Sequence, residues 1–450
     1  MKKRITTVVA IFLAVTVTYQ WGRLAELSSL LTLVGEANAK ETSEERKYRD
    51  HYYPGTEQLA PDEMRVIALG TGMPNARMSQ AGSCWLVELG NDDKFFFDLG
   101  TGCMEKFSVM GIPYGAANKV FLSHLHSDHY GGFQSWWMGG LVAGRRVGVE
   151  VWGPSGATPE LGTKYAIDKT IEALNWDITS RSGRLPSTPL ETKVHEFDYK
   201  AINAVVYEQN GVTVRTVPAI HAIDGPVSFI LEWNGLKFVF SGDTTPNKWL
   251  MKYGKEADIF IHEVFFTVDD LQNRFGWSLG ASIQINLLVH TAPPAFGKVM
   301  AEVKPRMGVA YHFFNDFDTG AAIQDEIRKI YDGPITLAKD MMVWNVTPDT
   351  VKAREIAFSE NSWPVEEPGP DPMVKFPNDF GKIRRQKWVE LVADDTGTTV
   401  QKTQQAITDQ LMCGAGNGVA YSPRIRHSAG NGPVTVRWSH PSGYAPNQRG

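Results

Sequence analysis

The chain has 450 residues, of which 42% are hydrophobic, and this is enough for one large or two ordinary domains with a sizeable core. Its 45 Lys and Arg are outnumbered by 50 Asp and Glu, which gives a net charge of −5. Proteins that grip a polynucleotide normally carry a basic excess, so this balance argues against nucleic acid as a partner.

The N-terminal segment 1–39 has the pattern of an export signal. Lys2, Lys3 and Arg4 precede the apolar run 5–17, and an Ala-Asn-Ala cleavage pattern ends at residue 39. The apolar run is shorter than the roughly 20 residues that span a bilayer. We therefore expect no stable membrane span after cleavage and a periplasmic or secreted protein, although a second weakly apolar patch at 30–34 leaves a retained anchor open.

Three further segments follow. Residues 40–62 are charged and contain proline, which is typical of a linker, and residues 63–357 have the alternating patterns of a folded domain. Residues 358–450 are predicted to be an extended and disordered tail, because they are first rich in Pro and Glu and then in Gly, Ser, Asn and Arg without an apolar period. The abrupt change in composition suggests a readthrough or a frame-altered tail.

The domain is predicted to alternate short strands with helices. The strands, in chain order, are 64–69, 84–89, 94–98, 120–122, 149–152, 212–217, 227–233, 237–240, 259–263 and 307–311. The helices are 104–110, 133–141 and 159–174, the last with Thr158 as its N-cap. Asn234-Gly235 between two apolar runs predicts a tight hairpin turn.

The segment 119–132 carries four potential metal ligands directly after an apolar run. His124 and His126 are spaced with a period of two and can point the same way. Asp128 and His129 lie around the following turn and can face a second position. Four such groups in six residues suit two adjacent metal ions, and this spacing before a Gly-Gly turn argues against a solvated loop or ordinary core histidines.

Other ligand-type side chains follow later predicted strands, where a layered α/β fold places its functional groups. They are His221, Asp243, His262, Glu263 and His312. Taken singly, His221 or His312 is as well explained as a buried, hydrogen-bonded histidine. Taken as a series with Asp243, they indicate one site. Since no cysteine has metal-ligand spacing, His and carboxylate groups would hold the metal.

Two features are left open by the sequence. Trp136 and Trp137 lie on a predicted helix, and core packing is favoured over a role at the rim of a pocket. Cys84 and Cys103 could be brought together by a hairpin and form a disulfide in an oxidising compartment. The third cysteine, Cys413, would then remain a free thiol, so the sequence gives this disulfide little support.

The His-x-His-x-Asp-His motif and the later ligand-type residues, in this order, resemble the metallo-β-lactamase superfamily. Within it they look like the ribonuclease Z and arylsulfatase-like branch, over residues 64–354. The resemblance implies an α+β fold for residues 63–357, an αββα sandwich of two mixed sheets flanked by helices, with a dinuclear centre. The two ions would be Zn²⁺, with Mn²⁺ or Fe²⁺ as alternatives. It assigns His124, His126 and His221 to one metal, Asp128, His129 and His312 to the other, and Asp243 to both.

The resemblance also supports a metal-dependent hydrolase. His290 is our candidate general acid and Glu263 its orienting partner, and Asp128 joins them in the predicted catalytic set. A surface histidine at a helix start is the alternative explanation of His290. Two metals sharing one site would favour phosphoryl or sulfuryl transfer, because they can stabilise the charge of the reacting ester.

The substrate is expected to be a small sulfate or phosphate ester. A ribonuclease Z would be expected to carry a long RNA-gripping arm between the positions of His221 and Asp243, which are only 22 apart here. Nearby aromatic residues would suit an aryl or apolar group, namely Trp136, Trp137, Phe265, Phe266, Phe313 and Phe314. A homodimer is compatible with this prediction.

Four alternatives remain. A ribonuclease Z-type endonuclease or a lactone hydrolase would use the same site. An iron oxidoreductase of the same fold is disfavoured, because such relatives resemble His-x-Glu-x-Asp, whereas His126 occupies the second position here. A degenerate binding module would lack some ligands, and none is missing.

Overall fold

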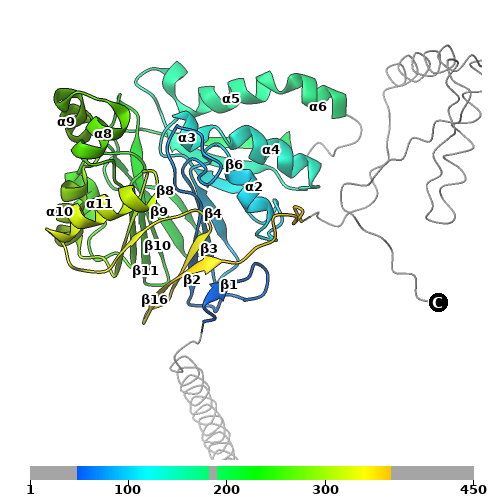
Figure 1. Ribbon diagram of the computed structural model, residues 1–450. Helices are drawn as coiled ribbons and strands as arrows, with labels where there is room; N and C mark the ends of the chain where they lie inside the picture. Colours follow the sequence, from blue (N-terminus) through cyan, green and yellow to red (C-terminus); the bar gives the residue numbers. More distant parts are fainter. Residues whose placement is uncertain (1–47, 182–189, 366–450) are drawn as a thin grey trace, which may run out of the picture.

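The computed structural model describes residues 48–181 and 190–365. In this part of the chain two mixed β-sheets pack face to face, and helices cover the outer face of each sheet (Figure 1). The predicted α+β sandwich, two mixed sheets flanked by helices, is confirmed.

The first sheet has nine strands and the second has seven. In spatial order the first contains β1 (His51–Tyr52), β16 (Val351–Ile356), β15 (Met342–Val346), β2 (Met64–Gly70), β3 (Cys84–Leu89), β4 (Lys94–Phe97), β5 (Lys119–Phe121), β6 (Val149–Pro154) and β7 (Thr192–Phe197). The second contains β14 (Ile335–Leu337), β13 (Met307–Tyr311), β12 (Ile259–Glu263), β11 (Leu236–Phe240), β10 (Val227–Trp233), β9 (Val212–Pro218) and β8 (Ala204–Gln209).

The helices belong to two groups. Beside the first sheet lie α2 (Cys103–Ser108), α3 (Ser127–Tyr130), α4 (Phe133–Val142), the 3₁₀ turn η1 (Pro159–Leu161), α5 (Thr163–Ala173) and α6 (Asn175–Arg181). Beside the second lie α7 (Lys248–Tyr253), α8 (Val268–Phe275), α9 (Leu279–Leu288), α10 (Pro293–Val303) and α11 (Phe317–Arg328).

The core has three layers, because each sheet is apolar on both faces. Between the sheets, aromatic rings pack closely, as shown by Phe97, whose ring centroid lies 4.8 Å from that of Phe238. A second layer packs between the first sheet and its helices, and it includes the fully buried Trp136 and Trp137 of α4. The core role of these two tryptophans is thus confirmed, and the alternative role at a pocket rim is wrong.

The arrangement of parallel strands places the site. β4, β5, β6 and β7 run parallel in the first sheet, and β11, β12, β13 and β14 run parallel in the second. The carboxyl ends of parallel strands meet at one edge of a sheet. The segments that follow β5, β11, β12 and β13 therefore converge at one edge of the sandwich.

Part of the segment expected to be a linker belongs to the domain. β1 pairs in parallel with β16, and Tyr52 is buried. Arg65 donates to the Tyr52 hydroxyl at 3.0 Å, and Arg354 binds the Glu57 carboxylate at 2.8 Å. Residues 48–62 are therefore fixed to the first sheet. The predicted signal at 1–39 and most of the predicted tail, residues 366–450, lie outside the described residues.

The segment 159–174, predicted to be mainly a helix, is helical with one interruption. It is divided into η1 and α5 at Gly162, whose backbone is extended, with φ −90° and ψ 161°. A Cβ at Gly162 would lie 2.5 Å from the Glu196 carboxylate, so a larger residue there would have to displace that side chain. Thr158 precedes η1, but its side chain makes no cap hydrogen bond.

Two smaller expectations can be compared with the described residues. Cys84 and Cys103 are buried free cysteines that lie side by side, and burial together with their contact raises the pKa of the Cys84 thiol well above its usual value. In residues 48–181 and 190–365, none of the helices combines the length and the hydropathy that a membrane crossing requires.

Candidate dinuclear metal centre

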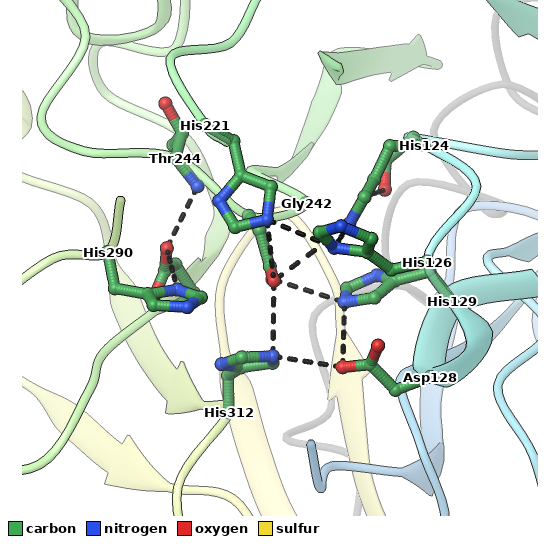
Figure 2. Close-up of polar contacts among 12 residues, drawn as sticks. His124, His126, Asp128, His129, His221, Gly242, Thr244, His290 and His312 are labelled. Atoms are coloured by element: carbon green, nitrogen blue, oxygen red, sulfur yellow. Dashed lines mark hydrogen bonds and ion pairs between the residues drawn. The ribbon is translucent and has the colours of Figure 1, made fainter. Parts of the chain in front are cut away.

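The first half of the candidate centre is made by the loop after β5 and by the segments that follow β9 and β11. Nε2 of His124 and Nδ1 of His126 lie 3.1 Å apart, and Nε2 of His221 lies 3.2 Å from the same His126 atom (Figure 2). Together with Asp243, these residues place one potential ligand atom each within 4.8 Å of the others. His124 and His126, two residues apart in the loop after β5, thus point to the same place, as their spacing predicts.

The second half lies around the start of α3. Asp128 and His129 come from the first turn of this helix, and His312 follows β13. Nε2 of His312 lies 3.2 Å from Asp128 and 3.1 Å from Asp243, and Nε2 of His129 lies 3.2 Å from Asp243. These four residues also form a set whose ligand atoms lie within 4.8 Å of one another.

Asp243 belongs to both halves. Its Oδ1 faces His129, while its Oδ2 lies 3.7 Å from Nε2 of His221 and 3.1 Å from Nε2 of His312. The preceding residue, Gly242, has φ 57°, and a Cβ there would lie 2.6 Å from the Ser123 side chain. Glycine is thus required for the loop after β11 to bring Asp243 into the cluster. All seven predicted ligands meet at one place.

The donor set fits two metal ions. Asp128 Oδ1 is buried and has no hydrogen-bond partner, which is costly unless a ligand satisfies it. Imidazole nitrogen and carboxylate oxygen are donors that Zn²⁺ accepts. The identity of the ion remains a prediction.

The electrostatics favour a cation at this place. Burial disfavours protonation of His312, but Asp243 and Asp128 outweigh it and raise the pKa of His312 to about 10. The same two carboxylates, with Asp98, hold the pKa of the buried His129 well above its usual value. In return, His129 and His312 overcome the burial of Asp243 and hold its pKa well below its usual value. A divalent cation would meet the same negative field.

Comparisons with known proteins agree with this geometry. A family model described as Anti-Pycsar protein Apyc1 matches residues 64–274. The chain is 28% identical to the ribonuclease Z of Mycobacterium bovis over 208 residues, which are 45% of this chain and 70% of the relative, and the ribonuclease Z of Mycobacterium marinum matches to the same extent. This chain is a hydrolase of the metallo-β-lactamase fold.

Among solved structures, the metallo-β-lactamase fold protein YhfI from Bacillus subtilis aligns with 63% of this chain and 99% of its own, at a TM-score of 0.46 and 18% identity.

Asp98 supports the second half of the hydrolase's centre. Its carboxylate accepts hydrogen bonds from Nδ1 of His129 at 2.6 Å and from the backbone N–H of Ser123 at 2.7 Å. This contact turns Nε2 of His129 towards Asp243. From the sequence, Asp98 was expected only to end the strand 94–98. Its position beside β5, the strand that precedes the metal motif, comes from the pairing of β4 with β5, which the sequence pattern does not specify.

His221 is oriented by a backbone carbonyl. Its Nδ1 donates to Val289 O at 2.9 Å, so its Nε2 faces the cluster. Val289 directly follows α9, and the next residue is His290. The loop after α9 therefore supplies a support for one predicted ligand and the predicted general acid.

His290 and Glu263 lie together beside the cluster. The ring of His290 stacks on Phe265, with centroids 4.4 Å apart, and its centroid lies 5.0 Å from that of His221 and 5.1 Å from that of His312. Glu263 is fully buried and accepts a hydrogen bond from the backbone N–H of Thr244 at 2.9 Å. The alternative explanation of His290 as a surface residue is wrong, because it is buried. Its catalytic role stays a prediction.

His262 points away from the centre. It is fully buried, its Nδ1 donates to Glu263 O at 2.7 Å, and its ring packs near Phe260 and Phe296. Neighbouring residues of a strand face opposite sides of the sheet, so Glu263 and His262 cannot both face the site. The strand-end position of His262 was therefore not a sign of metal binding.

A cavity of about 300 Å³ opens beside the first half of the centre. It is lined by His124, Leu125, His126, Pro154, Ser155, Glu160, Leu161, His221, Ala222, Ile223, Asp224, Gly225 and Pro226. None of the six aromatic residues expected to receive an aryl group is among them. Phe313 lies in the core against the second sheet, and Phe265 and Phe266 form a small cluster with Leu271.

Proposed function

We propose that this hydrolase cleaves small phosphodiesters, with sulfate esters as a related substrate class, and that it uses two divalent cations, normally Zn²⁺. The observation that carries the proposal is the single carboxylate of Asp243 between two sets of ligand-type side chains. Two ions held there would supply Lewis-acid stabilisation of the ester and activation of water near neutral pH.

The chain's own residues have separate tasks. His124, His126 and His221 would hold one ion, Asp128, His129 and His312 the other, and Asp243 both. His290 would donate a proton from Nε2 to the leaving alcohol, while Glu263 holds the proton on Nδ1 and stabilises the charged ring. Packing of Phe265 on one face of the His290 ring limits its movement and the access of water.

The cavity supports a compact substrate. At about 300 Å³ it is at the small end of ligand pockets. Leu161 and Ile223 give it an apolar wall, and its carboxylates are those of Glu160 and Asp224, while none of its described lining residues is Lys or Arg. The two carboxylates would repel a polyanion such as RNA. The apolar wall would bind the organic group of a diester that has a single phosphate.

Cleavage of RNA is the second candidate, and the curated relatives named ribonuclease Z favour it. Against it, the described chain between His221 and Asp243 contains only β10, β11 and their short connections. A long RNA-gripping arm has no room there. The basic and apolar pattern of residues 1–39 supports a periplasmic location, where a small ester is a more accessible substrate than RNA.

A substrate panel tests the proposal. Zinc-loaded protein would be assayed with bis-p-nitrophenyl phosphate, p-nitrophenyl sulfate, a simple lactone and a precursor tRNA. We expect the highest kcat/KM with the phosphodiester. A higher value for the precursor tRNA would support the ribonuclease instead, a preference for the lactone would support that alternative, and no turnover of any ester by fully loaded protein would overturn the proposal.

A further inference from the structure

His312 has a strained backbone. Its φ is 75°, in the left-handed region that non-glycine residues rarely adopt. Such a conformation persists only where the surrounding structure holds it. The first restraint is a hydrogen bond from the His312 N–H to Thr71 O, at 3.0 Å.

Thr71 begins the loop 71–82, which we call the clamp loop. Near its other end, Gln80 is buried and grips the segment that follows His312. Its Nε2 donates to Phe313 O at 2.9 Å, and its Oε1 accepts from the N–H of Asn315 at 3.2 Å. The clamp loop therefore binds the chain at His312 and at two of the next three residues.

Asp340 ties the two ends of the clamp loop together. Its Oδ1 accepts from the Thr71 N–H at 2.8 Å and from the Thr71 hydroxyl at 2.7 Å. Its Oδ2 accepts from the Ala81 N–H at 2.7 Å and forms an ion pair with Lys106 of α2. Both oxygens are thus fully used, and the side chain is only 4% exposed.

The clamp loop also touches Asp128. Gly82 packs so closely that a Cβ there would lie 2.6 Å from Asp128 O. Gly82 follows Ala81, whose N–H is bound by Asp340. Asp340 is therefore linked to His312 through Thr71, and to Asp128 through Ala81 and Gly82. Asp128 and His312 both belong to the second half of the centre.

We propose that Asp340 is a positioning residue for the Asp128–His129–Asp243–His312 half of the centre, and that it sets the metal affinity of this half. It holds the clamp loop, and the clamp loop holds His312 in its strained conformation and supports the backbone of Asp128. This inference rests on the proposed dinuclear centre but not on the identity of the substrate.

The substitution Asp340→Asn tests it. Asparagine keeps the shape but places an NH₂ group opposite either the Thr71 donors or Ala81 and Lys106. Affinity for one of two Zn²⁺ equivalents should fall about 10- to 100-fold, as is usual when a support of a metal ligand is lost. The other equivalent should bind as in the wild type. Both affinities would be measured by competition with a chromophoric zinc chelator.

Asp258→Asn is the matched control. Asp258 is also a buried carboxylate that accepts a backbone N–H, from Lys237 at 2.7 Å, and pairs with a base, Arg306 at 2.6 Å. It lies just before β12, at the opposite end of that strand from Glu263. This variant should lose thermal stability but keep both zinc affinities.

Gln80→Leu provides a second variant should Asp340→Asn fail to fold. This substitution removes the hydrogen bonds to Phe313 and Asn315 and leaves Asp340 unchanged. The affinity for the same Zn²⁺ equivalent should fall, by a smaller factor than in Asp340→Asn. The inference would be overturned if folded variants kept both zinc affinities, or if their affinities for the two Zn²⁺ equivalents fell equally. Binding of fewer than two Zn²⁺ by the wild type would instead overturn the dinuclear centre itself, so the two failures are distinguishable.

Discussion

Nδ1 of His290 lies 3.1 Å from one carboxylate oxygen of Glu263 and 3.2 Å from the other. Glu263 is fully buried and receives the backbone N–H of Thr244 as well, so this carboxylate fixes both the ring and the loop after β11. The pair thus has the geometry of a proton donor with its orienting group, placed between His221 and His312.

Replacement of His290 should affect substrates according to their leaving group. His290→Ala should lower kcat about 10²- to 10⁴-fold for an alkyl phosphodiester, because an alkoxide must be protonated as it leaves. Nitrophenolate leaves without a proton, so the loss with bis-p-nitrophenyl phosphate should be much smaller. Equal losses for both substrates would contradict the role of general acid. Glu263→Gln should give the same pattern with smaller losses.

Replacement of Asp243 should damage both halves of the centre. Asp243→Ala removes the only carboxylate that the two sets of potential ligands share, so we expect loss of at least one zinc per chain and of most turnover. Zinc content by elemental analysis and kcat on the same preparation would be compared. Asp325→Ala, an exposed carboxylate of α11, is the control. Two zinc ions and full turnover in Asp243→Ala would disprove the bridging role.

The apolar wall of the cavity should determine affinity for the organic group. Leu161 and Ile223 are 50% and 61% exposed and line the cavity beside His126. Ile223→Ser should raise KM for diesters with bulky apolar groups several-fold and change kcat little, since the wall would bind substrate and transition state equally. Dimethyl phosphate would serve as the small reference substrate. A lower kcat with unchanged KM would contradict this assignment.

Removal of metal should lower thermal stability. Ions that bind only the folded state stabilise it by about 2.7 kcal/mol at 100 times their Kd. A chelator should therefore decrease Tm by several degrees, and added Zn²⁺ should restore it. In Asp243→Ala, the decrease in Tm caused by the chelator should be smaller. A Tm that is insensitive to chelator in zinc-loaded wild-type protein would contradict metal binding at this buried cluster.

The ion pair that anchors the N-terminal segment should weaken in acid. Glu57 is partly desolvated, which raises its pKa, but Arg354 and Arg49 outweigh this and hold the pKa below its usual value. Its contribution to stability is therefore fully present above the unfolded pKa of about 4.3 and is lost as pH falls through the lower folded value. Glu57→Gln should lower Tm at pH 7, and the difference from wild type should shrink towards pH 3. Both proteins would be compared with chelator present.

The sequence alone determined the central strands of both sheets and the potential metal ligands. Apolar runs that end in polar residues predicted the central strands, because burial of a strand and the turn that follows it are local properties. The hexad 124–129 indicated two metals for the same reason, since neighbouring residues of a strand and of a helical turn have fixed relative directions.

The tertiary structure decided what depends on distant contacts. It turned His262 away from the site and buried His290 against Phe265. It showed that Asp98 orients His129 and that the cavity is lined by Leu161 and Ile223 rather than by the expected aromatic residues. It also joined Asp340 to His312 through the clamp loop. None of these relations has a local signal, because each depends on how segments far apart in the chain pack against one another, and packing is set by the whole fold.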